Sequence, residues 1–105
     1  MPTADQTYDE AVALQEQGNL EQAIETIAAL LQDHPDHALA HAAMSVWCGR
    51  AKRFDEAVTH AKRVCELEPE DPFSFVALSL ICQKAGRISE AEEAGMQARR
   101  MQFNA

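Results

Sequence analysis

The stretch RFDEAVTH (residues 53–60) occurs three times in this chain in slightly different form. Moved back by 34 residues it aligns with NLEQAIET (19–26), and moved forward by 34 it aligns with RISEAEEA (87–94). All three copies keep an apolar residue in the second position and alanine in the fifth. Similarity at a fixed period of this length indicates a stacked helical repeat.

The whole chain can be written as three lines of equal length, residues 4–37, 38–71 and 72–105, which we interpret as one domain, 1–105. Each line predicts two helices. The first helices are expected over 4–17, 37–51 and 72–85, and the second helices over 20–33, 54–67 and 88–102. The start and stop signals are capping boxes at Thr3–Gln6 and Asn19–Gln22, an N-cap at Asp71 before Pro72, and glycines at Gly18 and Gly86.

The columns of this alignment resemble the tetratricopeptide repeat (TPR) family over essentially the entire chain. The matching columns are a small residue at position 8 (Ala11, Ser45, Ser79), glycine at 15 (Gly18, Gly86), alanine at 20 (Ala23, Ala57, Ala91) and proline at 32 (Pro35, Pro69). The departures are Thr7, His41 and Phe75 at position 4, Lys52 for the second glycine and Phe103 for the third proline.

The resemblance implies an all-α fold, a right-handed superhelical array of three antiparallel helix pairs. It also implies that the alanine column marks the close approach of the two helices of a pair, and that the first helices line a concave side where ligands bind. Trp47 is expected on the face of its helix turned toward repeat one, inside the core.

The two ends of the array are expected to be capped by polar residues, so that three repeats form a complete module. The second-helix positions that meet the next repeat are Ile24, Ile27 and Leu31, then Val58, Ala61 and Cys65, then Glu92, Gly95 and Arg99. They turn from apolar to polar at the last repeat. At the front, Gln6, Glu10 and Gln17 occupy the corresponding outer positions. Met101 and Phe103 are expected to fold back over the last helix.

The net charge of −8 lies entirely in the first third of the chain, because residues 1–37 contain eight acids and no Lys or Arg, whereas the rest carries nine acids and nine bases. Such a field repels phosphate backbones and anionic lipids, which argues against nucleic-acid and membrane partners. The N-terminus carries no targeting signal, and three cysteines without a Cys-x-x-Cys pair suit a reducing compartment. These features predict a cytoplasmic protein.

No motif of an enzyme is present, and we expect neither catalysis nor a cofactor. His34, His37 and His41 lie near one turn at a spacing that could hold a metal ion, but no further ligand is close in sequence. We interpret them as surface histidines and expect no metal site. The cysteines Cys48, Cys65 and Cys82 are interpreted as buried thiols rather than a disulfide pair.

The candidate binding surface is a stripe along the first helices. Residues 38–49 and 72–83 contain no Asp, Glu, Lys or Arg, so these helices are apolar all round although one side should face an open groove. The stripe comprises Tyr8, Val12, Leu39, Ala42, Val46, Phe73, Val76 and Leu80, with Arg50 and Lys84 at its rim.

The family's carboxylate clamp for acidic C-termini is not expected here, because the clamp positions hold Tyr8, Val12, Ala43, Phe73 and Ala77. The function predicted is a non-enzymatic protein–protein interaction module that binds an apolar helix or extended segment in the groove, in an adaptor or chaperone-like role. The alternative is a homo-oligomeric scaffold that associates through the groove or through the ends of the array.

Overall fold

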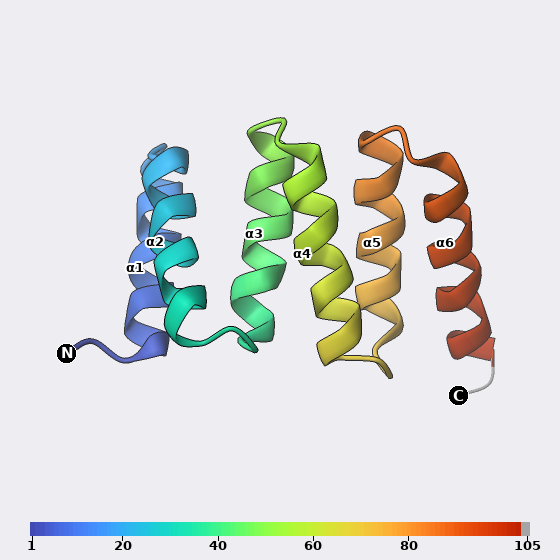
Figure 1. Cartoon of the computed structure of the whole chain (residues 1–105), viewed down its shortest axis with the longest axis horizontal. Coiled ribbons are helices and arrows are strands. Elements are labelled where there is room, and N and C mark those ends of the chain that lie inside the picture. Colours follow the sequence, from blue (N-terminus) through green and yellow to red (C-terminus); the bar gives the residue numbers. More distant parts are fainter. Residues whose placement is uncertain (104–105) are drawn as a thin grey trace.

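Six helices make up the structure, a computed structural model that describes residues 1–103 (Figure 1). They are α1 (Ala4–Glu16), α2 (Leu20–Asp33), α3 (Ala38–Arg50), α4 (Phe54–Leu67), α5 (Pro72–Lys84) and α6 (Ile88–Phe103). Every helix predicted from the sequence is present, and each end lies within one residue of its predicted position. The all-α prediction is confirmed.

The helices stand side by side in chain order as three antiparallel pairs, α1–α2, α3–α4 and α5–α6 (Figure 1). The array is elongated, with extents of 43 × 27 × 21 Å, and the two chain ends lie at opposite ends of its long axis. Each repeat therefore packs only against its neighbours, as in other solenoids.

The turn inside each pair uses one residue with a left-handed backbone. Gly18 and Gly86 have φ of 87° and 77°, and Lys52 occupies the equivalent place with φ of 62°. Glycine adopts this region without a steric penalty, whereas a side chain brings Cβ close to the following carbonyl oxygen. The middle turn therefore keeps the geometry of the other two at a conformational cost.

Replacing Lys52 with glycine is expected to stabilise the protein by up to about 1 kcal/mol, because it relieves this cost. The gain is reduced by the greater freedom of glycine in the unfolded chain. Thermal unfolding followed by circular dichroism measures it. Lys52→Ala, which removes the long side chain and keeps Cβ, is the matched control and should not reproduce the gain.

Two of the three predicted N-caps form. The Thr3 hydroxyl accepts from the backbone N–H of Gln6 at 3.1 Å while the Gln6 side chain accepts from the Thr3 N–H at 2.8 Å. The Asp71 carboxylate accepts from the N–H of Phe73 at 3.0 Å. The box predicted at Asn19 is wrong, because its side chain makes no capping bond. Asn19 directly follows the tight turn, which holds its ψ at 61° instead of the extended value of an N-cap.

The core follows the repeat columns. Ala23, Ala57 and Ala91 are at most 3% exposed, as expected where two helices approach closely. Between the repeats, Ile24 and Ile27 are covered by α3, whose Trp47 is 6% exposed. The predicted burial of Trp47 and of the alanine column is confirmed.

The three cysteines are buried and free, as predicted. Burial raises the pKa of all three thiols, that of Cys65 to about 11. The Cys65 Sγ–H also donates to the Ser74 carbonyl at 3.3 Å. These thiols therefore stay protonated and fill the core rather than react.

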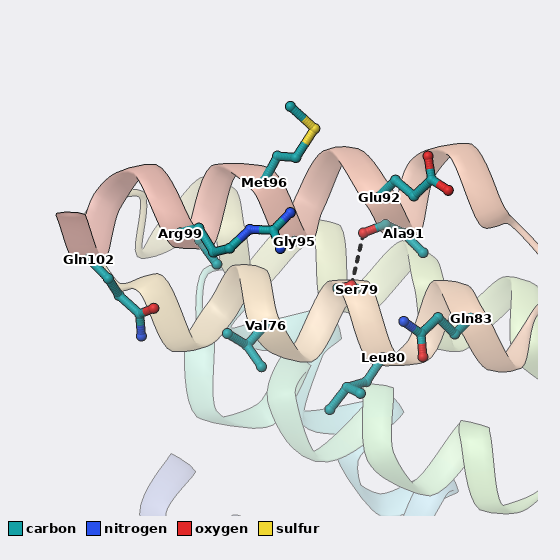
Figure 2. Close-up of a pocket in the computed structure, with 11 residues that line it drawn as sticks. Val76, Ser79, Leu80, Gln83, Ala91, Glu92, Gly95, Met96, Arg99 and Gln102 are labelled. Carbon is teal, nitrogen blue, oxygen red and sulfur yellow. Dashed lines mark hydrogen bonds between the residues drawn. The ribbon is translucent and has the colours of Figure 1, made fainter. Parts of the chain in front are cut away.

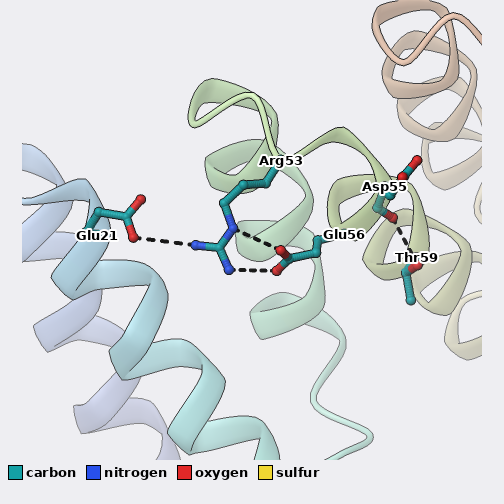
Figure 3. Close-up of polar contacts among 5 residues, drawn as sticks. All are labelled: Glu21, Arg53, Asp55, Glu56 and Thr59. Atoms are coloured by element: carbon teal, nitrogen blue, oxygen red, sulfur yellow. Dashed lines mark hydrogen bonds and ion pairs between the residues drawn. The ribbon is translucent and has the colours of Figure 1, made fainter.

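Ion pairs that repeat with the helices join neighbouring repeats. Arg53 bridges Glu56 of its own helix, at 2.7 Å, and Glu21 of α2, at 3.5 Å (Figure 3). Arg87, one period later, reaches Asp55 at 2.7 Å. The side chains of these pairs are partly or largely exposed, so the pairs contribute little to stability.

Candidate interaction surface

Five large apolar side chains on α3 and α5 are open to solvent. Leu39 and Val46 of α3 are 55% and 50% exposed, and Phe73, Val76 and Leu80 of α5 are 71%, 37% and 54% exposed. We call these five residues the apolar stripe. All five belong to the surface predicted from the sequence.

The stripe residues of α3 lie on the side of the helix opposite its packed face. On α3, Ala40, Met44 and Cys48 are at most 3% exposed. The two halves of the stripe adjoin because α3 and α5 approach closely at Gly49, where a Cβ atom would lie 2.9 Å from Ile81 Cδ1. Exposed large apolar residues on two neighbouring helices that have no charged residues in their middle are typical of an interaction site.

The predicted residues of α1 are less available. Tyr8 and Val12 are half-buried and pack against the core, and the Tyr8 ring stacks on His37 with centroids 6.2 Å apart. Ala42 is half-buried between the exposed residues of α3. The exposed part of the predicted surface therefore lies on α3 and α5.

Charged residues stand at one end of the stripe. Arg50 and Lys84 lie in the last turns of α3 and α5 and are both exposed. Ala43, counted from the sequence among the clamp positions, is buried at 8% exposure, because it faces the core rather than the open side. The remaining clamp positions offer only the Tyr8 hydroxyl as a side-chain donor to a carboxylate.

The interpretation of the three histidines as surface residues is wrong for His41, which is buried, whereas His37 is half-buried and His34 is exposed. His37 caps α3, because its Nδ1 accepts from the backbone N–H of Ala40 at 3.0 Å. His41 is 8% exposed and lies between two polar partners, with its Nε2 at 2.7 Å from the Pro35 carbonyl and its Nδ1 at 2.9 Å from Nδ1 of His60.

These contacts fix the tautomers of the histidine pair. A carbonyl oxygen only accepts, so His41 carries its hydrogen on Nε2 and its Nδ1 accepts from Nδ1–H of His60. Burial, and then the charge of His41, lower the pKa of His60, while Glu56 opposes them. The contact between the two rings joins α3 to α4.

Stability is expected to fall as the solution is acidified below about pH 6.5, the ordinary histidine value. The lowered pKa means that His60 binds a proton less readily in the folded protein than in the unfolded chain. The stability that the neutral His60 ring contributes is therefore complete above this pH and is lost as the pH falls below it. Because one proton is taken up, the free energy of unfolding falls by at most about 1.4 kcal/mol for each pH unit.

The check is chemical denaturation between neutral pH and pH 5, with wild type compared with His60→Gln, which keeps a donor for His41. The variant should lose less stability on acidification. His34→Gln, at an exposed position, should behave as wild type. Equal slopes for all three proteins would contradict the assignment to His60.

Within residues 1–103, no group of three or more His, Cys, Asp or Glu side chains is arranged to hold a metal ion. In the same part of the chain, no helix is long and apolar enough to cross a membrane.

The end of the array differs from its expected form. Phe103 is 91% exposed and does not fold back, because α6 continues without a break through this residue and carries its side chain away from the core. Met101 is only partly buried. Ala94 and Ala98 are buried, so α6 is held by the face that it turns to α5.

Comparisons with solved structures identify the fold. The second TPR of Spaghetti (RPAP3), bound to the HSP90 peptide SRMEEVD, matches with a TM-score of 0.81 at 17% identity, over 93% of this chain and 91% of that one. The MamA 41-end chain from Desulfovibrio magneticus RS-1 matches with a TM-score of 0.83 at 19% identity, over 94% of this chain. A chain of the CopN-Scc3 complex matches with a TM-score of 0.87 at 14% identity, over 93% of this chain.

The chain spans only 56% and 58% of the matched MamA and CopN-Scc3 chains. No family model and no curated protein matches the sequence. The structural matches therefore define the class by its fold, and the six helices are three TPR-type helix pairs.

Proposed function

We propose that the chain, taken as one domain over residues 1–105, is a non-enzymatic protein–protein interaction module that works in the cytoplasm. The observation that carries this proposal is the apolar stripe, five exposed large side chains on two adjoining helices of a TPR fold. The similar structure of the second TPR of Spaghetti (RPAP3), solved with a bound HSP90 peptide, supports peptide binding as an activity that this fold can perform.

The ligand is inferred from the chemistry of the stripe. Leu39, Val46, Val76 and Leu80 offer apolar contact area, and Phe73 adds an exposed aromatic ring. We infer an apolar helix or extended segment of a protein, oriented at its polar end by Arg50 and Lys84. Tyr8, Val12 and Ala42 would extend the contact toward α1. The acidic first repeat disfavours nucleic acid and membrane surfaces.

Selection of peptides from a displayed library tests this ligand chemistry. The peptides recovered should carry several large apolar residues, and they should bind as well with an amidated C-terminus as with a free carboxylate. Peptides rich in Asp and Glu that depend on a free C-terminal carboxylate would contradict the proposal, because they would indicate a carboxylate clamp that binds acidic C-termini.

The second candidate is a homo-oligomeric scaffold. In that case, a second copy of the chain covers the exposed apolar stripe. Sedimentation equilibrium at low and high concentration separates the two. The interaction module should have the mass of a monomer at both concentrations, whereas the scaffold should show a mass that rises with concentration.

A further inference from the structure

A hollow opens on the outer face of repeat three, between α5 and α6 (Figure 2). Its volume is about 470 Å³. Val76 and Leu80 of α5 form one wall, and Met96 and Arg99 of α6 form the other, with Gly95 between them. The hollow is continuous with the apolar stripe through Val76 and Leu80 but extends away from α3, onto α6.

The equivalent face of the other two repeats is covered by a helix. The α6 positions Glu92, Gly95 and Arg99 correspond, by the 34-residue period, to Ile24, Ile27 and Leu31 and to Val58, Ala61 and Cys65. In repeat one this face packs against α3, and in repeat two it packs against α5. The hollow thus has the shape of a seat for one more helix of the same kind.

The Ser79 hydroxyl on the floor of the hollow is satisfied within the protein. It donates to the Ala91 carbonyl at 2.8 Å (Figure 2). A Cβ atom on Gly95 would still lie 3.4 Å from this hydroxyl, and nothing else comes within 4 Å. The space left by Gly95, where repeat one has Ile27, admits a large apolar side chain from an incoming helix.

Between repeats one and two, the equivalent face of α2 is covered by large residues of α3. Met44 of α3 lies with Ile24, Ala28 and Leu31 of α2 around one cleft. Trp47 follows one turn later on the same helix and is buried. An occupant with a small residue followed by two large apolar residues, spaced as Ala40, Met44 and Trp47, therefore matches the seat.

The charges at the rim set the direction of the occupant. A helix seated like α3 or α5 runs antiparallel to the second helix before it (Figure 1). Its first turn would then lie beside Arg99, and its last turn beside Glu92. Arg99 forms no ion pair with any residue from 1 to 103. An acid in the first turn and a base in the last turn also complement the helix dipole.

A second copy of the chain fits this seat poorly. The outer face of α1 presents Gln6, Glu10, Ala13 and Gln17. Glu10 could meet Arg99, but no large apolar side chain on this face would fill the hollow. The chemistry favours a different protein.

We propose that the outer face of repeat three is a second binding site, which takes an amphipathic helix of a partner protein antiparallel to α6. The helix carries large apolar residues over Gly95, with an acid in its first turn opposite Arg99. This site shares Val76 and Leu80 with the apolar stripe, but it extends onto α6 instead of α3 and takes a different ligand.

The test uses a fluorescein-labelled synthetic helix of about 16 residues, long enough for four turns. It carries the Ala–Met–Trp spacing of residues 40, 44 and 47, Glu in its first turn and Lys in its last turn, and its binding is followed by fluorescence anisotropy. Arg99→Glu should weaken binding by about tenfold or more. Arg100→Glu, the same charge change one residue away and outside this hollow, is the matched control and should stay within about twofold of wild type.

A peptide with Lys in place of the first-turn Glu should reverse the preference and bind Arg99→Glu better than wild type. The proposal is overturned if the peptide does not bind, or if both arginine variants bind it equally. It is also overturned if Leu39→Glu weakens binding as strongly as Arg99→Glu does, because the peptide would then occupy the apolar stripe. Self-association that Glu10→Arg and Arg99→Glu each abolish would assign the seat to a second copy and overturn the proposal as well.

Discussion

Replacing Trp47 with alanine is expected to lower the free energy of unfolding by about 3–5 kcal/mol, as for other large truncations in a core. Trp47 is 6% exposed and belongs to the core cluster that joins repeats one and two. Each repeat is stabilised only through its neighbours, so a cavity here weakens the whole array. Small domains have about 5–15 kcal/mol of stability in total, so the variant should be largely unfolded at moderate temperature.

Denaturant unfolding followed by circular dichroism measures this loss. Trp47→Phe, which keeps an aromatic ring, is the matched control and should lose less. Because Trp47 is the only tryptophan, its fluorescence reports the same site, and the native protein should show a blue-shifted emission maximum that moves to the red on unfolding. A solvent-like maximum in the folded protein would mean that the orientation of α3 is wrong.

Replacing Val46 or Leu80 with glutamate is expected to weaken binding of an apolar partner segment by about tenfold or more, which corresponds to about 1.4 kcal/mol. Both residues are half-exposed, at 50% and 54%, so the charge remains hydrated in the free protein. In the complex, the same carboxylate would have to be buried against an apolar surface, and its desolvation is costly.

The matched control for these two variants is Ala29→Glu, which adds the same charge at an exposed position on α2, outside the stripe. All three variants should keep the helicity and melting temperature of wild type, and the control should also keep its affinity. If the two stripe variants unfold, Val46 and Leu80 belong to the core. If they fold and bind normally, the binding surface lies elsewhere.

The helices could be predicted closely because their signals are local and occur three times. Gly18 and Gly86 mark the turns, Asp71 and Pro72 mark the start of α5, and the 34-residue period transfers each boundary from one repeat to the next. The period also explains why Lys52 takes a left-handed backbone although nothing about lysine favours it.

The errors occurred where a distant residue or a neighbouring turn decides the outcome. His41 is buried because His60, 19 residues away on α4, supplies a partner for its ring, and no local pattern shows this pairing. Asn19 has the residue type of an N-cap but not the backbone that a cap needs. Phe103 could be placed only by knowing that α6 runs straight through it.

The exposed apolar residues of α3 and α5 could be predicted because these helices lack charged residues in their middle and yet have one side that no other helix of residues 1–103 covers. Helices without a charge in their middle must be buried, and an array open on one side leaves Leu39, Val46 and Leu80 uncovered. The partial burial of Tyr8 could not be predicted, because its ring stacks on His37 beyond the end of α2. The ion pair between Arg53 and Glu21 was also missed, although both residues recur one period later as Arg87 and Asp55.

Chemical-shift mapping with a selected apolar peptide tests the central claim most directly. Amide signals of ¹⁵N-labelled protein are followed while the peptide is added. The largest shifts are expected from α3 and α5, around Leu39, Val46, Phe73, Val76 and Leu80, with smaller shifts near Tyr8 and Val12. Shifts confined to α2 and α4, with the signals of these residues unmoved, would contradict the claim.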